Sequence, residues 1–163
     1  MSTQLESAQA ELTPDVRREI NWFTPPGERR FVDAAAISAA ATVLLGLFYS
    51  GMLEGLKETV KAEGKKTGLW LGEKIAERLR AITSGHEQPD PAQTEQTAQA
   101  ARAALQGQDQ KQVGWVFDEV ETEMRTSFAQ VMPDGRAATF ATRVRHVAVR
   151  ALDAGKVSPD AMV

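Results

Sequence analysis

The sequence predicts an all-α protein, a helical bundle of about five to six helices with one central, nearly uncharged apolar helix. Aromatic residues make up only 6% of the 163 residues, and alanine is abundant. Alanine loses no side-chain entropy in a helix and gives a strand little to pack, so this composition favours helices. Apolar residues also recur at helical spacing, for example at Leu71, Ile75, Leu79 and Ile82.

The overall composition is that of a folded chain able to bury one core, with 42% hydrophobic and 25% charged residues. There is no cysteine, which excludes disulfides, thiolate metal ligands and a cysteine nucleophile, and is compatible with a reducing cytoplasm. The net charge is −3 and no block is strongly basic, so nucleic acid is not an expected partner.

Residues 1–84 form the predicted N-terminal helical region. Thr13 and Pro14 are typical of a helix start, with threonine as cap and proline at the first helical position, and this short helix ends near Phe23. The next helix begins near Glu28 and contains the apolar segment, in a membrane-active or core helix over 28–56. Two glycines at 64 and 68 predict a bend before a further helix that ends near Ser84.

Residues 85–94 are polar and contain proline, so they are predicted to be a linker to the C-terminal helices of 95–163. The alanine- and glutamine-rich stretch Pro91–Gln106 predicts a helix with little to bury. An antiparallel helical hairpin is predicted over 109–154, with a turn at 133–135. Its arms are of opposite charge, because residues 108–135 carry −4 and residues 136–163 carry +3.

The apolar segment Ala34–Leu53 has 20 residues without a charge. As a helix it is roughly 30 Å long, which matches the hydrocarbon core of a bilayer. Its larger apolar residues each favour insertion by about 0.3–0.6 kcal/mol, whereas serine, threonine, tyrosine and glycine oppose it, so insertion is marginal. The residues predicted to face lipid or a protein core are Ile37, Val43, Leu44, Leu45, Leu47, Phe48 and Leu53.

Three interpretations of this segment stay open on sequence alone. It can enter a bilayer, constitutively or conditionally, or it can be the central helix of a soluble bundle, apolar all round because its neighbours enclose it. The third is a targeting signal, since Arg29 and Arg30 precede the segment, although no cleavage site follows.

Small residues recur every four positions along and beyond the segment, as in a glycine zipper. This spacing places them on one ridge of a helix, where two backbones can approach closely, and in lipid it promotes helix association. We therefore expect self-association into a homo-oligomer. The predicted helix-packing residues are Ser38, Thr42, Gly46, Gly51, Gly55, Gly64, Gly68 and Gly72.

The apolar helix, the zipper spacing of Gly64, Gly68 and Gly72, and the all-helical remainder resemble the HeLo and Bell-type membrane-targeting effectors. The resemblance covers residues 28–84 and lies in the architecture. It implies oligomerisation and permeabilisation of a bilayer when the protein is triggered. The amyloid-like signalling motif that many members carry is not present here.

A candidate basic contact face lies on the last helix, formed by Arg136, Arg143, His146 and Arg150. It can bind the phosphates of lipid or nucleic acid. The interpretation that we prefer is a solvated face paired with the acidic residues of the preceding helix, Asp118, Glu119, Glu121 and Glu123.

No catalytic, cofactor-binding or metal-ligating motif is recognised. The two histidines, His86 and His146, are sixty residues apart and neither has a partner at ligand spacing. We therefore predict no enzymatic activity and no cofactor. The predicted function is that of a membrane-active, self-associating helical protein, cytoplasmic with conditional or constitutive membrane association and possessing pore-forming potential. The alternative is a soluble adaptor or assembly subunit, with a protein partner bound through the C-terminal hairpin.

Overall fold

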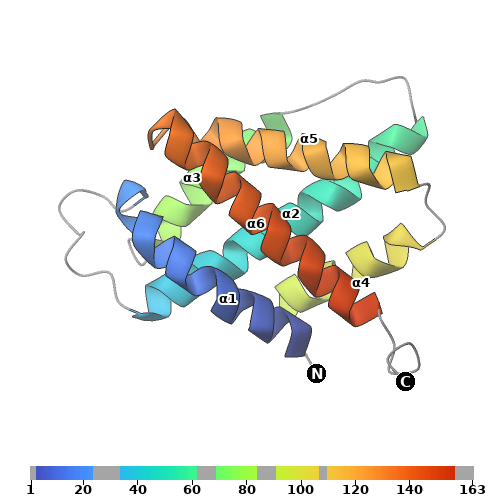
Figure 1. The fold of residues 1–163 in the computed structure, drawn as a ribbon, viewed down its shortest axis with the longest axis horizontal. Coiled ribbons are helices and arrows are strands. Elements are labelled where there is room, and N and C mark those ends of the chain that lie inside the picture. The colour runs from blue at the N-terminus through green and yellow to red at the C-terminus, as the bar shows by residue number, and fades with distance from the viewer. Residues whose placement is uncertain (1–2, 24–33, 62–68, 84–90, 107–109, 157–163) are drawn as a thin grey trace.

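The computed structural model describes residues 3–23, 34–61, 69–83, 91–106 and 110–156. Within them the chain forms six α-helices, one short 3-10 helix and no strand. The helices are α1 (Thr3–Glu19), α2 (Ala34–Lys61), α3 (Leu69–Thr83), α4 (Pro91–Leu105), α5 (Gln110–Phe128) and α6 (Asp134–Lys156), and the 3-10 helix η1 (Ile20–Trp22) extends α1. The all-α bundle with one long apolar helix is confirmed (Figure 1).

The apolar helix α2 lies at the centre of the bundle. It packs against all five of the other α-helices, whereas α1 packs only against α2, α6 and η1 among the stronger helix contacts. In Figure 1, α1 and α6 lie in front of α2, and α5 crosses above it. One hydrophobic core extends from Ala8 to Leu152, so the two predicted regions, before and after residues 85–94, share the same core.

The first helix differs from the prediction. The helix start predicted at Thr13 is wrong, because α1 begins ten residues earlier and Pro14 lies inside it. The Thr13 hydroxyl donates to the Gln9 carbonyl oxygen at 2.6 Å, one turn back, instead of capping the helix. Proline in a helix interior costs about 3 kcal/mol, and the burial of Ala8 and Leu12 against the core offsets this cost.

The helix of the apolar segment continues past Glu54 to Lys61, as its pattern allowed. Its predicted start at Glu28 lies outside the described residues, as do the bend at 64–68 and most of the linker. Helix α4 follows the predicted range, but the prediction that it has little to bury is wrong. Thr94, Ala98 and Ala101 are buried, and α4 packs on α2.

Helices α5 and α6 pack against each other and are joined by a short turn, so they form a helical hairpin. Helix α5 ends at Phe128, four residues earlier than predicted, because the amides of Ala129, Val131 and Met132 bond to the last carbonyls in a tight turn. The rings of Phe128 and Phe140 pack with centroids 4.8 Å apart, and Phe23 meets Phe128 edge-on at 5.8 Å. This aromatic cluster joins the hairpin to the end of η1.

Burial at the centre of α2 makes a direct prediction about stability. Leu45 has no exposed surface, whereas Leu53 on the same helix is half-buried. Leu45→Ala should lower the free energy of unfolding by about 2–5 kcal/mol, because it leaves a cavity that the bundle cannot fill. Leu53→Ala is the matched control and should cost clearly less. Urea unfolding followed by circular dichroism measures both, and equal losses would contradict a core centred on α2.

Candidate functional site

The apolar segment of α2 is enclosed in protein. Over Ala34–Leu56 it is 23 residues long with a mean hydropathy of 1.7, and it is the one helix among the described residues that could cross a membrane by length and composition. In the same structure 67% of its most apolar window is buried. Leu53 is half-buried, and the other predicted residues of this set are buried: Ile37, Val43, Leu44, Leu45, Leu47 and Phe48.

The polar groups within α2 have partners inside the bundle. The Thr42 hydroxyl donates to the Ser38 carbonyl oxygen at 3.1 Å, and that oxygen also accepts a bond from Gln9 of α1 at 3.2 Å. The buried Tyr49 hydroxyl donates to the Ala148 carbonyl oxygen of α6 at 3.0 Å. Burial raises the pKa of Tyr49 far above its usual value, so this donor stays protonated. The bundle therefore provides hydrogen-bond partners for these polar groups of α2 and also buries its apolar side chains.

The small residues of α2 allow neighbouring helices to approach. A Cβ placed on Gly46 would lie 3.2 Å from Thr94 Oγ1 of α4, and one on Gly55 would lie 2.9 Å from Val116 Cγ1 of α5. Gly51 and Thr42 are buried, and Ser38 is half-buried. Gly72 belongs to α3, and Gly64 and Gly68 lie outside the described residues. In this state Gly46 and Gly55 are packed within one chain.

Three ion pairs join α1 to α6, and we call them the ion-pair ladder: Glu19–Arg136, Asp15–Arg143 and Glu11–Arg150. The carboxylates are four residues apart on α1 and the arginines seven apart on α6, so each series follows one helix face. The Arg136 guanidinium donates from Nε and Nη2 to the two oxygens of Glu19, at 2.9 and 2.7 Å. These bonds and the charge of Glu19 raise the pKa of Arg136.

The two members of each pair differ in exposure. The side chains of Asp15 and Glu19 are only 9% and 8% exposed, whereas those of Arg143 and Arg136 are 35% and 45% exposed. Asp15 has a second partner on its own helix, because Arg18 donates to it at 2.5 Å. The carboxylates therefore lie beneath a seam of arginines that face outward.

The predicted pairing of the basic face with α5 differs from the structure. Arg136, Arg143 and Arg150 pair with α1, whereas Arg145 bridges to α5, where it contacts Asp118 and Glu121 at 2.5 and 2.7 Å. Burial alone lowers the pKa of Arg145, but these two carboxylates outweigh it and the net shift is upward. Glu121 also accepts a bond from Thr142 at 2.8 Å.

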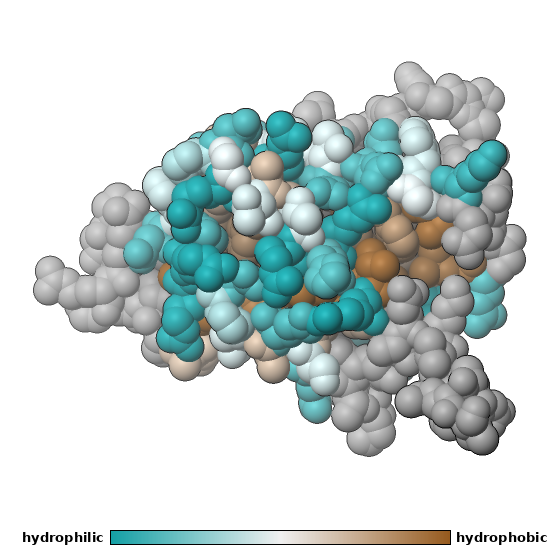
Figure 2. Space-filling model, viewed as in Figure 1, coloured by the Kyte–Doolittle hydropathy of each residue, from teal (hydrophilic) through white to brown (hydrophobic). Residues whose placement is uncertain are grey.

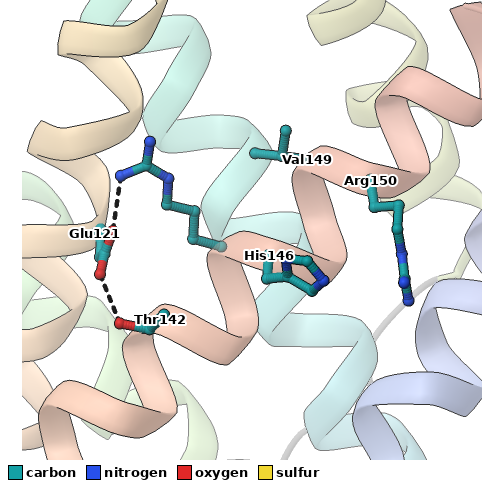
Figure 3. Close-up of a pocket in the computed structure, with 6 residues that line it drawn as sticks. Glu121, Thr142, His146, Val149 and Arg150 are labelled. Atoms are coloured by element: carbon teal, nitrogen blue, oxygen red, sulfur yellow. Dashed lines mark hydrogen bonds and ion pairs between the residues drawn. The ribbon is translucent and has the colours of Figure 1, made fainter.

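His146 lies in a groove of about 510 Å³ on the outer side of the hairpin. The groove is lined by Glu121, Thr142, Arg145, His146, Val149 and Arg150. In Figure 3 the Arg150 side chain points toward α1, away from Glu121, and the dashed lines mark the contacts of Glu121. Among the residues that the structure describes, no group of three or more histidines and carboxylates is placed to hold a metal ion. The two arginines of its lining are both paired, Arg145 with Glu121 and Arg150 with Glu11 of α1.

The acidic side of the ladder was missed by sequence reasoning. Glu11, Asp15 and Glu19 repeat every four residues beside the apolar Leu12, Val16 and Ile20. Carboxylates so close to a buried stripe need cationic partners. That spacing was the available signal, but the wrong helix start at Thr13 separated Glu11 from the other two.

Alanine substitutions at two glycines can distinguish the effect of close helix packing from that of helix propensity. Gly55→Ala should destabilise the protein by about 1–3 kcal/mol, because its Cβ would press on the stiff side chain of Val116. Gly114 of α5 has nothing within 4 Å of its Cβ position, so Gly114→Ala should stabilise by about 0.5–1 kcal/mol. Thermal unfolding measures both. Stabilisation by both changes would show that the α2–α5 contact is looser than described.

The ladder predicts coupling between α1 and α6. In a double-mutant cycle with Asp15→Asn and Arg143→Gln, we expect a coupling energy of about 1–2 kcal/mol, because Asp15 is buried. The control cycle uses Asp118→Asn and Arg145→Gln. Asp118 is 68% exposed, so its coupling should stay below about 1 kcal/mol. Coupling no greater in the first cycle than in the second would contradict a ladder that holds α1.

Comparison with known proteins assigns no family to this chain. No family model, no curated protein and no solved structure matches it. The resemblance of residues 28–84 to HeLo and Bell-type effectors stays a prediction.

Proposed function

We propose that this protein is a membrane-active helical protein that is stored as a water-soluble bundle and inserts α2 into a bilayer when the bundle opens. The observation that carries the proposal is a helix of bilayer length held at the centre of a bundle. The 23 residues of Ala34–Leu56 are roughly 35 Å long as a helix, enough to cross the hydrocarbon core with some tilt.

The balance between the two locations of α2 is close. Its larger side chains favour lipid by a few tenths of a kcal/mol each, and its alanines contribute little. Inside the bundle the same side chains are already out of water, so lipid offers little further gain from the hydrophobic effect. Modest changes in the surrounding helices therefore decide where α2 resides.

Helix α1 is the segment best placed to open first. Like α3 and α4, it packs mainly on two other α-helices, and unlike them it carries the acidic side of the ion-pair ladder, which supplies part of its attachment. Figure 2 shows that the face over α1 and α6 is largely hydrophilic, with a hydrophobic patch between α5 and the later half of α6. Removal of α1 would uncover the part of α2 on which α1 packs, near Ser38, whose carbonyl oxygen accepts a bond from Gln9.

The small residues of α2 give the inserted helix a surface for self-association. In the bundle Gly46 and Gly55 receive Thr94 and Val116. Once α4 and α5 move away, either site can receive a second copy of α2, because Gly46 follows Ser38 and Thr42 in one four-residue series and Gly55 follows Gly51 in another. Oligomerisation and permeabilisation follow from this step, and the protein acts from the cytoplasm on a membrane.

A soluble adaptor or assembly subunit is the second candidate. It is favoured because α2 makes its polar and packing contacts within the bundle. The Tyr49 hydroxyl donates to α6, and side chains of α4 and α5 pack on Gly46 and Gly55. If the hydrogen bonds and the packing of α2 are satisfied inside the bundle, α2 does not require a membrane. In this case the hairpin of α5 and α6 presents the partner-binding surface.

A label on α2 separates the two candidates. The chain has no cysteine, so Ser50→Cys, at an exposed position of α2, can carry a single environment-sensitive fluorophore. The label should be tested in the wild-type background and in Asp15→Asn/Glu19→Gln, which loosens α1, with vesicles of zwitterionic and anionic lipid. We expect a blue-shifted emission that lipid-phase quenchers reduce and aqueous iodide does not, together with dye leakage.

The control label is Thr122→Cys, exposed on α5, which should stay accessible to iodide. If the Ser50 label stays aqueous in both backgrounds with every vesicle, the membrane proposal is wrong and the soluble adaptor is the better candidate.

A further inference from the structure

The ion-pair ladder has an inner acidic side and an outer basic side. The carboxylates of Asp15 and Glu19 are nearly buried, whereas Arg136, Arg143 and Arg150 have side chains 45%, 35% and 53% exposed. The three arginines extend over roughly 21 Å of α6, two turns apart from one another. A flat anionic surface can therefore reach all three while α1 is still in place.

Each guanidinium presents N–H donors beyond those its carboxylate uses. Arg143 donates from Nε and Nη2 to the single oxygen Oδ2 of Asp15, at 3.2 and 3.1 Å. Arg136 uses the same two nitrogens for Glu19. The planar guanidinium has five N–H donors and suits phosphate oxygens, so a headgroup phosphate can bind from the outer side.

We propose, resting on the proposed function, that Arg136, Arg143 and Arg150 form a binding surface for the phosphates of an anionic bilayer, and that α1 occupies this surface in the soluble protein. Glu11, Asp15 and Glu19 then act as an internal substitute for lipid phosphate. An anionic membrane displaces α1 and opens the bundle over α2. Lipid charge is thus the trigger.

The displacement follows from a difference in affinity between two states. With α1 docked, three carboxylates lie against the three arginines and weaken their attraction for phosphate. With α1 released, those carboxylates have left α6. A ligand shifts an equilibrium by its differential affinity, so an anionic surface favours the released state, whereas a zwitterionic surface has little preference.

The release of α1 is eased by Arg18. It belongs to α1 and contacts both buried carboxylates, Asp15 at 2.5 Å and Glu19 at 3.6 Å. When α1 leaves, Asp15 and Glu19 regain water, and Arg18 stays near them along the chain. The carboxylates of α1 therefore do not become unpaired buried charges when α1 leaves. The arginines of α6 exchange these carboxylates for lipid phosphates.

Flotation of the full chain with two kinds of vesicle tests the proposal, phosphatidylcholine alone and equal parts of phosphatidylcholine and phosphatidylglycerol. We expect wild type to partition preferentially into the anionic vesicles. Arg136→Gln/Arg143→Gln/Arg150→Gln should lower that partition coefficient by roughly a hundredfold, about fivefold for each arginine. The matched control is Arg17→Gln/Arg80→Gln/Arg125→Gln, which removes equal charge from exposed positions outside the ladder and should change it within about twofold.

Neutralising the carboxylates should act in the opposite direction. Asp15→Asn/Glu19→Gln keeps the arginines but weakens the attachment of α1, so it should bind anionic vesicles about tenfold more tightly than wild type. The change also raises the net charge by two, so the gain should exceed that of the matched control Glu54→Gln/Asp118→Asn, which neutralises two exposed carboxylates outside the ladder. A purely structural role of the ladder predicts equal gains. Circular dichroism of each variant checks that the bundle is folded.

Three results would overturn the inference. These are equal partition into both vesicles, equal losses for the ladder and control triples, and tight binding of soluble inorganic polyphosphate by the same arginines without a preference for anionic lipid. The label at Ser50 keeps this failure apart from that of the proposed function. Insertion of α2 without dependence on lipid charge would remove the trigger and leave membrane activity intact.

Discussion

The structure depends on the enclosure of one helix. An apolar helix of bilayer length can stay in water only if other helices cover its large apolar side chains, because each exposed Å² of apolar surface carries a free-energy cost. Here α1, α3, α4, α5 and α6 all pack on α2. The order of the other elements, the amphipathic stripes they carry and the close approach at Gly46 and Gly55 follow from this requirement.

The covering helices are not equivalent. The hairpin of α5 and α6 is joined by an aromatic cluster of Phe128 and Phe140, and α6 is further tied to α2 by the Tyr49 hydroxyl. Helix α1 contributes the apolar stripe of Ala8, Leu12 and Val16 and carries its carboxylates close to the core. Its attachment therefore contains a larger electrostatic part than that of the hairpin, and electrostatic attachments respond to the charge of their surroundings.

The sequence predicts those elements whose information is local. The apolar segment of α2 and the hairpin were predicted because hydrophobic spacing and the turn at 133–135 are each contained in a short window. The extent of α1 was not predicted, because the burial of Leu12 by distant helices outweighs the helix start that Thr13 and Pro14 indicate. The burial of α4 was not predicted either, since Thr94 becomes a core residue only where Gly46 leaves room for it. The ladder joins residues more than a hundred positions apart, and its acidic members carry no hydrophobic pattern.

Because α1 contains a proline, its release from the bundle and the loss of its helical structure should occur together. Pro14 cannot donate to the carbonyl one turn back, and isolated helices of this length are marginal in water even without such a defect. Detached from α2 and α6, this segment should lose its helical order and gain backbone entropy of about 1–2 kcal/mol for each residue freed. The helix must then form again when α1 docks. A higher temperature therefore favours the release of α1, and its docking is comparatively slow.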